Sequence, residues 1–227
     1  QRNIDDKIVI DYSREYVLRA CEESLKRLKR ETIDYYQLHA ARMPHLQNGE
    51  CIEAMELLKQ QGKVRYWGLS LNTFAPAPEA EWMMEHKAGD GFQLVFNLIN
   101  KRAYGVMQQA ANNGYGIIAR MPFQFGLLTG KFSPNTTFDA NDHRSFRLTP
   151  EIIEKSMKVL EQVDVSAAKA LSFILTCKEV STVIPGIRTP EHVKQNTTGI
   201  QTLSPEEQEH LLSMDWKPVM ELMEKQG

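Results

Sequence analysis

The clearest candidate for a ligand-binding loop runs from Gly126 to Lys131 and reads GLLTGK. Its two glycines allow a ligand to approach the backbone closely, and Thr129 and Lys131 add a hydroxyl group and a cation. The residues before it, 116–119, form a short apolar run that predicts a buried strand, and Pro122 ends strand pairing because proline has no backbone N–H. At the carboxyl end of a parallel strand, such a loop suits an anionic ligand. Glycine-rich loops are common, so the rest of the chain has to decide whether this one binds phosphate.

Other predicted strands also end in polar side chains. Strand-like segments begin near residues 33, 64, 92 and 116 and so recur every 24 to 31 residues, which is the period of strand–helix–strand units. Their carboxyl ends, with that of a last strand at 180–184, carry His39, Ser70, Gln93 with Asn97, Arg120, and the segment 184–188. Because the carboxyl ends of parallel strands meet at one edge of a sheet, we expect these side chains at a common rim.

The elements that must position these residues alternate between strands and helices. Amphipathic patterns and cap residues predict helices at 13–29, 51–60, 78–87, 103–112, 150–163, 166–177 and 190–196, and another that begins at Ser204. The polar segment 133–149 is expected to be a surface excursion or lid. The strands are too apolar to leave one face in water, which predicts a parallel sheet covered by helices.

Six strands are expected in all, because the segment 7–10 also reads as a buried strand. Six strands would fit either an open doubly wound sheet or a closed barrel. No GxGxxG signature follows an early strand, and the candidate ligand residues come from the ends of many strands. These two features favour the closed α/β barrel.

Composition narrows the class of protein and of ligand. The 227 residues fit one large domain, or a barrel slightly below the usual size of roughly 250 residues. A net charge of -2 gives no electrostatic reason to expect nucleic acid or an anionic membrane as a partner, so the ligand should be small. Cys21, Cys51 and Cys177 are far apart and lack CxxC spacing, so we expect reduced thiols and neither disulfides nor a metal site. With no signal peptide and no long apolar run, a cytoplasmic protein is expected, and a homo-oligomer stays open.

Five motifs at the strand ends occur together in a known family. IDYYQLH, GKVRYWGLS, FQLVFNL, ARMPFQFGLLTGK and STVIPGIRTPEHVKQN resemble, in this order, successive strand motifs of the aldo-keto reductases, and the resemblance covers residues 13–212. It implies a single (β/α)8 TIM-barrel domain over residues 1–227 that is incomplete on its N-terminal side. It also implies an oxidoreductase that binds NADPH (NADP+) across the strand ends and transfers a hydride to the carbonyl of an aldehyde or ketone, giving an alcohol.

The resemblance assigns the reacting end of this site to residues of four strands. His39 matches the family's active-site histidine, which orients and polarises the substrate carbonyl; the alternative for a lone histidine is a structural role. Ser70 and Gln93 match positions that bind the nicotinamide carboxamide, although Leu71 replaces the asparagine that often follows the serine. Arg120 takes a place that is frequently aromatic, where its planar guanidinium could stack on the nicotinamide or form a salt bridge.

The phosphate end falls on loop and helix positions of the last motifs. The resemblance gives this role to Gly126, Leu128, Lys131, Gly186, Arg188, His192, Gln195 and Asn196. Free N–H groups and the helix dipole favour a phosphate at the start of the helix 190–196. Arg188 is our choice for the 2′-phosphate that distinguishes NADPH from NADH, and the alternative is a solvated surface charge. His192 stands where the family commonly has arginine, and an imidazole binds phosphate more weakly near neutral pH.

The family's catalytic aspartate, tyrosine and lysine belong to its first three strands, and we place none of them here. The segment 7–10 looks like the third strand, but its continuation lacks the lysine. Tyr35 is no substitute, since it precedes His39 by four residues and lies roughly 13 Å deeper, and Tyr36 points to the other face. Either segments are omitted from the chain or the protein is truncated. The abrupt junctions at 10–11 and 164–165 favour omitted segments.

Three functions remain on these grounds. The first is a carbonyl reductase, and the second is a nucleotide-binding sensor or accessory subunit of the same fold with little turnover. The third is an unrelated phosphate-binding barrel enzyme such as an aldolase or isomerase. The variable loops 40–50 and 131–149 are expected to set substrate specificity.

Overall fold

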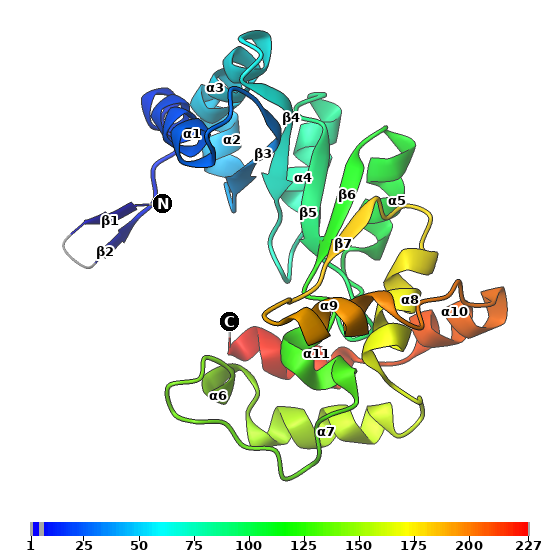
Figure 1. Ribbon diagram of the computed structural model, residues 1–227. Helices are drawn as coiled ribbons and strands as arrows, with labels where there is room; N and C mark the ends of the chain where they lie inside the picture. Colours follow the sequence, from blue (N-terminus) through cyan, green and yellow to red (C-terminus); the bar gives the residue numbers. More distant parts are fainter. Residues whose placement is uncertain (1, 5–6, 227) are drawn as a thin grey trace. The chain divides into compact units, whose positions relative to one another are not determined.

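The computed structural model describes residues 2–4 and 7–226. The chain divides into two compact units. The first unit holds the residues up to Gln93 together with Gln109–Gly116, and the second holds Leu94–Gln108 and the residues from Ile117 onward. Figure 1 traces the chain through the elements of both units.

Helices and strands alternate over most of the chain. The strands are β1 (Arg2–Ile4), β2 (Lys7–Val9), β3 (Ile33–His39), β4 (Val64–Ser70), β5 (Gly91–Val95), β6 (Gly116–Arg120) and β7 (Thr182–Ile184). The helices are α1 (Arg14–Leu28), α2 (Met43–Asn48), α3 (Glu50–Gln60), α4 (Ala77–Glu85), α5 (Tyr104–Asn112), the 3₁₀ helix η1 (Gln124–Thr129), α6 (Arg144–Arg147), α7 (Pro150–Leu160), α8 (Ala167–Thr176), α9 (Pro190–Thr197), α10 (Pro205–Ser213) and α11 (Lys217–Lys225). Each helix predicted from the sequence is present, with ends that differ by a few residues.

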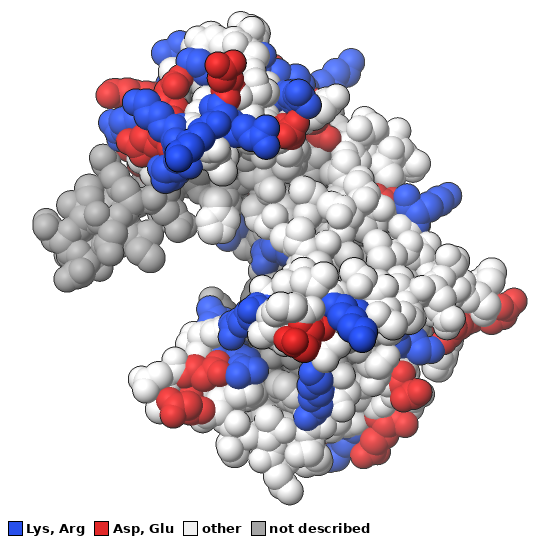
Figure 2. All heavy atoms as spheres, viewed as in Figure 1, with Lys and Arg blue, Asp and Glu red and all other residues white. Residues whose placement is uncertain are grey.

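Helix α1 illustrates how the pattern produces the element. Ser13 caps its first turn by accepting a hydrogen bond from the amide of Tyr16. Val17, Cys21 and Leu25 recur every fourth residue and are buried on one face, which stabilises the fold by roughly 2 kcal/mol for each large side chain. The other face is charged, and acidic and basic side chains lie side by side over the first unit in the view of Figure 2.

The strands of the first unit pair in parallel, as predicted. His39 of β3 lies opposite Ser70 of β4, and Ser70 lies opposite Gln93 of β5. Trp67 and Leu69 point to the opposite face and are fully buried. The indole N–H of Trp67 donates to Glu56 of α3, so this face packs against the helical layer. Alternation therefore places Ser70 on the face turned away from α3.

In the second unit, β6 and β7 also pair in parallel. Ile118 lies opposite Thr182, and Arg120 lies opposite Ile184. Side-chain caps start the helices that follow: Thr149 for α7, Ser166 for α8, Thr189 for α9 and Ser204 for α10. No helix among the described residues combines the length and the apolar character that a membrane crossing requires.

The segment 7–10 is the main correction to the expected fold. It does form a strand, but β2 pairs antiparallel with β1 in a separate two-stranded sheet, with Arg2 opposite Val9. Antiparallel strands can follow each other closely in the chain, whereas parallel strands need a long crossover. The assignment of this segment to the barrel sheet was wrong.

Three segments expected to be loops contain short helices, and in the segment 131–149 this helix is α6. The segment 40–50 holds α2, which has Pro44 in its first turn and ends at Gly49 with φ of 84°. The GLLTGK segment begins inside η1, where the backbone kinks at Phe125 and Gly126. Helices this short leave little periodicity in the sequence, so the turn residues dominated the prediction.

Gly68 offers a test of the strand packing in the first unit. A Cβ atom at this position would lie 2.0 Å from the carbonyl oxygen of Gly91 and 2.0 Å from the hydroxyl of Tyr35. We expect Gly68→Ala to lower the free energy of unfolding by about 2 to 3 kcal/mol, measured by urea denaturation. Gly105→Ala is the control, because nothing lies within 4 Å of a Cβ there and alanine favours the helix. Equal stability of the two variants would contradict this packing.

Candidate functional site

The polar residues at the strand ends of the first unit form one row. The strand register aligns His39, Ser70 and Gln93, which belong to three neighbouring strands. The Nε2 atom of Gln93 donates to the Oγ atom of Ser70 over 3.4 Å. Ser70 is 5% exposed and His39 is exposed, so the row runs from the protein interior to solvent. Three of the predicted site residues are therefore brought together.

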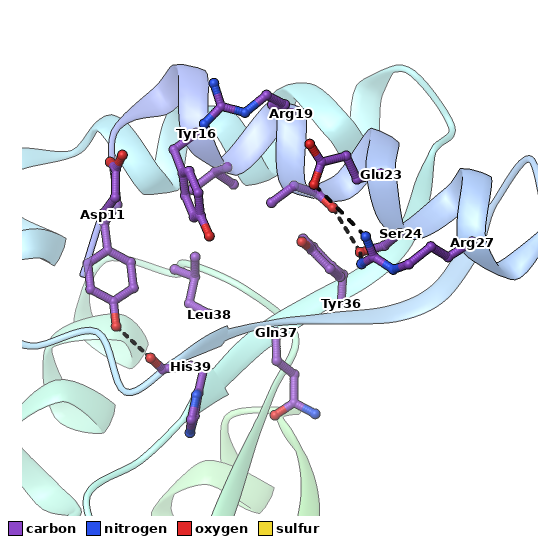
Figure 3. A pocket seen from close by; sticks show the side chains of 13 residues that line it. Asp11, Tyr16, Arg19, Glu23, Ser24, Arg27, Tyr36, Gln37, Leu38 and His39 are labelled. Carbon is purple, nitrogen blue, oxygen red and sulfur yellow. Dashed lines mark hydrogen bonds and ion pairs between the residues drawn. The ribbon is translucent and has the colours of Figure 1, made fainter. Parts of the chain in front are cut away.

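Gln37 belongs to the same row of contacts, although the sequence analysis did not single it out. Its Nε2 atom donates to Oε1 of Gln93 over 3.4 Å, and its own Oε1 is buried without a hydrogen-bond partner. Both amide contacts are long, so a ligand amide can replace them at small cost. The signal was present in the sequence, because Gln37 precedes His39 by two residues and shares its face. Figure 3 shows both side chains on the same side of β3.

The other face of β3 turns towards α1. Tyr36 and Leu38 point towards α1 in Figure 3 and line a cavity of about 520 Å³ between α1 and β3. Tyr36 thus faces away from the row, as predicted.

Tyr35 lies on the same face of β3 as His39, and its hydroxyl lies against Gly68. Burial raises the pKa of Tyr35, so its hydroxyl stays protonated near neutral pH.

The backbone around His39 is held by a residue that the sequence analysis missed. The hydroxyl of Tyr12 donates to the carbonyl oxygen of His39 (Figure 3). Ala40 follows with φ of 59°, and its amide donates to the carbonyl oxygen of Ser70 over 3.2 Å. Contacts from two separate segments therefore fix the end of β3. Tyr12 lies outside any repeating pattern, so only the folded chain reveals this contact.

The second unit contains a pocket of about 670 Å³. Five residues predicted to bind the cofactor line it: Arg120, Gly126, Gly186, Arg188 and His192. They come from the end of β6, from η1, from the connection between β7 and α9, and from the first turn of α9. Other lining residues include Met121, Phe123, Gln124, Phe125, Thr129, Asp142, His143 and Arg144.

Four further predicted residues lie outside the lining of this pocket. The side chain of Leu128 is fully buried in the core, so only its backbone could meet a ligand. Lys131 and Gln195 are exposed to solvent. Asn196 is buried, and its side-chain amide donates to the carbonyl oxygen of Gly186 over 3.3 Å. Asn196 therefore holds the turn before α9.

The charges of the pocket favour an anion. Asp142 is the acid among the lining residues, and Arg144 binds it through Nε, through Nη2 and through its backbone amide. These hydrogen bonds hold the pKa of Asp142 well below its usual range, so the pair is neutral overall near pH 7. Burial lowers the pKa of Arg120, but a guanidinium stays charged in proteins. Arg188 and Arg120 are further cations of the lining, so cationic side chains outnumber the acid.

His192, in the first turn of α9, lines this pocket. Thr189 caps the helix by accepting from the amide of His192 over 3.3 Å. The amide of Arg188 donates to Nδ1 of His192 over 3.2 Å, which leaves Nε2 of the imidazole as the N–H donor. Across the described residues, no three His, Cys, Asp or Glu side chains converge as metal ligands do.

Comparison with known proteins gives a consistent result. The model of the aldo/keto reductase family matches residues 3–214. An uncharacterized oxidoreductase of Bacillus subtilis is 30% identical over 189 residues, which are 82% of this chain and 60% of the relative. L-Glyceraldehyde 3-phosphate reductase of Escherichia coli O157:H7 is 28% identical over 213 residues, with 85% and 60% covered. The chain spans about 60% of the length of these curated relatives.

Solved structures show the same fold. The holo form of an aldo-keto reductase from Bacillus halodurans superposes with a TM-score of 0.74 and 25% identity, over 90% of this chain and 68% of the other. A glycerol dehydrogenase from Gluconobacter oxydans gives a TM-score of 0.72 at 24% identity, over 92% of this chain and 66% of the other. The expected β/α fold of the TIM-barrel type is confirmed.

The cap of α9 can be tested directly. We expect Thr189→Ala to lower the free energy of unfolding by about 1 kcal/mol, because the amide of His192 loses its side-chain acceptor. Thr189→Ser is the matched control and should retain most of the stability, since serine keeps the hydroxyl. Urea denaturation measures both variants. A loss as large in Thr189→Ser as in Thr189→Ala would exclude the cap as the cause.

Proposed function

Because the chain belongs to the aldo-keto reductase family, we propose that it acts in an NADPH-dependent oxidoreductase that reduces the carbonyl of an aldehyde or ketone to an alcohol. The observation that carries this proposal is the row of His39, Ser70 and Gln93 at the ends of three paired strands. A donor and an acceptor side by side suit a carboxamide, and a histidine next to them suits a carbonyl oxygen.

The residues of the second unit fit the phosphate end of NADPH. Their pocket carries positive charge, and its acid is paired with Arg144. We assign the 2′-phosphate to Arg188, with support from the imidazole of His192 and the dipole of α9. The backbone at Gly126, Leu128 and Gly186 and the side chains of Lys131, Gln195 and Asn196 complete the phosphate end, whereas Arg120 is assigned to the nicotinamide. The anionic phosphates would thus meet donors from three segments.

The chemistry divides between cofactor and protein. When bound, NADPH supplies the hydride. Ser70 and Gln93 would fix the face of the nicotinamide by binding its carboxamide, and Gln37 would hold the amide of Gln93 in register. His39 would orient the substrate carbonyl and stabilise negative charge on its oxygen. We assign the proton donor to no described residue.

We further propose that both units belong to one barrel domain, because a single family match runs across them. We also propose a cytoplasmic protein. Its three cysteines are buried and unpaired, which fits a reducing compartment. Burial raises the pKa of Cys21 and of Cys177 to about 11, so both remain unreactive thiols near neutral pH.

The assignment of Arg188 predicts a change in cofactor preference. Arg188→Gln should raise the dissociation constant for NADPH about tenfold and leave that for NADH within about twofold, because only NADPH carries the 2′-phosphate. Fluorescence titration with each cofactor measures both constants. Lys194→Gln, also on the exposed surface of this region but outside the pocket lining, is the control. Equal losses of affinity for NADPH and NADH would show that Arg188 does not bind the 2′-phosphate. If the unmodified protein did not bind NADPH at micromolar concentration, the proposed function would be wrong.

His39 should affect turnover and spare cofactor binding. We expect His39→Ala to lower kcat by about a hundredfold or more and to leave the NADPH dissociation constant within about twofold, since the imidazole acts on the substrate carbonyl. Steady-state kinetics with an aldehyde substrate measure kcat, and titration with NADPH measures the dissociation constant. His86→Ala is the control, because His86 stacks on Trp82 in another part of the first unit. Parallel losses in kcat and cofactor affinity would contradict this role.

A further inference from the structure

Asn97 is a fully buried polar residue that the proposed chemistry does not use. Its Oδ1 atom accepts from the amides of Ile99 and Asn100 over 2.9 and 2.8 Å, which closes a turn after β5. Its Nδ2 atom donates over 2.8 Å both to the carbonyl oxygen of Met121 and to Oε1 of Gln124. All four hydrogen bonds have good lengths, so the position of Asn97 is fixed from both sides.

The two acceptors of Nδ2 lie in a strained turn. Met121, Gln124 and Phe125 have φ of 56°, 43° and 57°, values that L-residues other than glycine rarely adopt. Each such residue costs roughly 1 to 2 kcal/mol, and the turn persists only if its surroundings hold it. Asn97 bonds to the first two of these residues, and the third follows at once in the chain.

The strained turn forms a wall of the pocket in the second unit. Met121, Phe123, Gln124, Phe125 and Gly126 all line it, beside Arg120 and Arg188. Gln124 is 3% exposed, and its Nε2 atom in turn donates to the sulfur of Met223 in α11 over 3.2 Å. A chain of contacts thus runs from the turn after β5, through Asn97 and Gln124, to the C-terminal helix.

We propose that Asn97 is a positioning residue for the cofactor: by holding Met121 and Gln124, it keeps the 121–126 turn in the shape that the phosphate groups of NADPH meet. This inference rests on the proposed function for its ligand, but not for the geometry of the turn. If Asn97 only completed the packing of the core, any nearby acceptors would satisfy its side-chain amide. Instead, both N–H groups of this amide donate to the one turn that shapes the pocket.

The experiment compares Asn97→Ser with Asn100→Ser. Serine at position 97 keeps an oxygen that can accept from the amide of Asn100 but has no second branch to reach Met121 or Gln124. We expect the dissociation constant for NADPH to rise about tenfold, as the loss of two hydrogen bonds of about 1 kcal/mol each allows. Asn100 is equally buried, and its side-chain oxygen accepts from the amide of Arg102 instead. Asn100→Ser is therefore the same chemical change at a matched site and should alter the constant by less than about twofold.

A second measurement needs no cofactor. Amide hydrogen exchange of residues 121–126 in the ligand-free protein should become faster in Asn97→Ser and stay unchanged in Asn100→Ser, because only the first change releases the turn. Equal effects of the two variants on NADPH affinity or on this exchange would overturn the proposal and leave Asn97 as an ordinary core residue. If the unmodified protein failed to bind NADPH, the proposed function would fall, and the exchange comparison would still decide whether Asn97 holds the turn.

Gln124→Met provides the test if Asn97→Ser does not fold. It removes one acceptor of Asn97 with little change in volume and leaves the bond to Met121 in place. We expect a smaller loss of NADPH affinity, about threefold, with faster exchange confined to 121–126. Combined with Asn97→Ser, it should add almost nothing, because both changes break the same contact. Fully additive losses would count against a shared role.

Discussion

The strand register of the first unit is the constraint on which its chemistry depends. Side chains alternate along a strand, so a slip of one residue would send Ser70 and Gln93 to the helical face and bring Trp67 to the other. Asp90 opposes such a slip. Its carboxylate accepts from the amide of Trp67 over 2.9 Å, while its own amide donates to the carbonyl oxygen of Trp67 over 2.7 Å. Lys59 binds the same carboxylate through both oxygens, so the clamp also ties α3 to the beginning of β5.

Small residues below the row make this register possible. Gly68 and Gly91 lie opposite each other, two residues before Ser70 and Gln93 in their strands. The glycines leave room for the phenol of Tyr35, which fills the space that their side chains would occupy. The polar row therefore rests on a packed layer instead of an open channel, and its amides keep the orientation that the strands impose.

The second unit relies on side chains that bind backbone carbonyl groups at the ends of elements. Lys101 lies four residues after Asn97 and donates to the carbonyl oxygens of Leu211, Leu212 and Met214, where α10 ends. Burial lowers the pKa of Lys101 to about 8, so the folded state loses this proton more easily than the unfolded chain does. Stability from this group consequently increases as pH rises from about 8 towards the ordinary lysine value, because the unfolded state then binds more protons. The turn 97–101 thus fastens both the pocket wall and the C-terminal segment.

Sequence patterns predicted what depends on local repetition and missed what depends on distant contacts. The strands near 33, 64, 92 and 116 and the caps Ser13 and Ser204 follow from periodicity and side-chain chemistry, and the order of the polar strand ends gave the family. Tyr12 acts through one hydrogen bond to the distant His39, and Asn97 donates to Met121 and Gln124, which lie more than 20 residues away, so no local spacing encodes these contacts. The hairpin of β1 and β2 shows the same limit, because a short apolar run does not reveal its pairing partner.

The two walls of the pocket in the second unit differ in how they are held. The turn at Met121 is fixed by short hydrogen bonds to a buried amide. The facing segment 138–147 meets η1 and its own aromatic residues through cation–π contacts: Arg147 lies 5.6 Å from the ring of Phe125, and Arg144 lies 4.6 Å from that of Phe138. Such contacts contribute about 1 kcal/mol at exposed sites and tolerate sliding, whereas paired hydrogen bonds do not. A rigid wall suits a ligand group of constant shape, such as the phosphates proposed above. An adaptable wall of arginine and aromatic side chains suits ligand groups of variable shape.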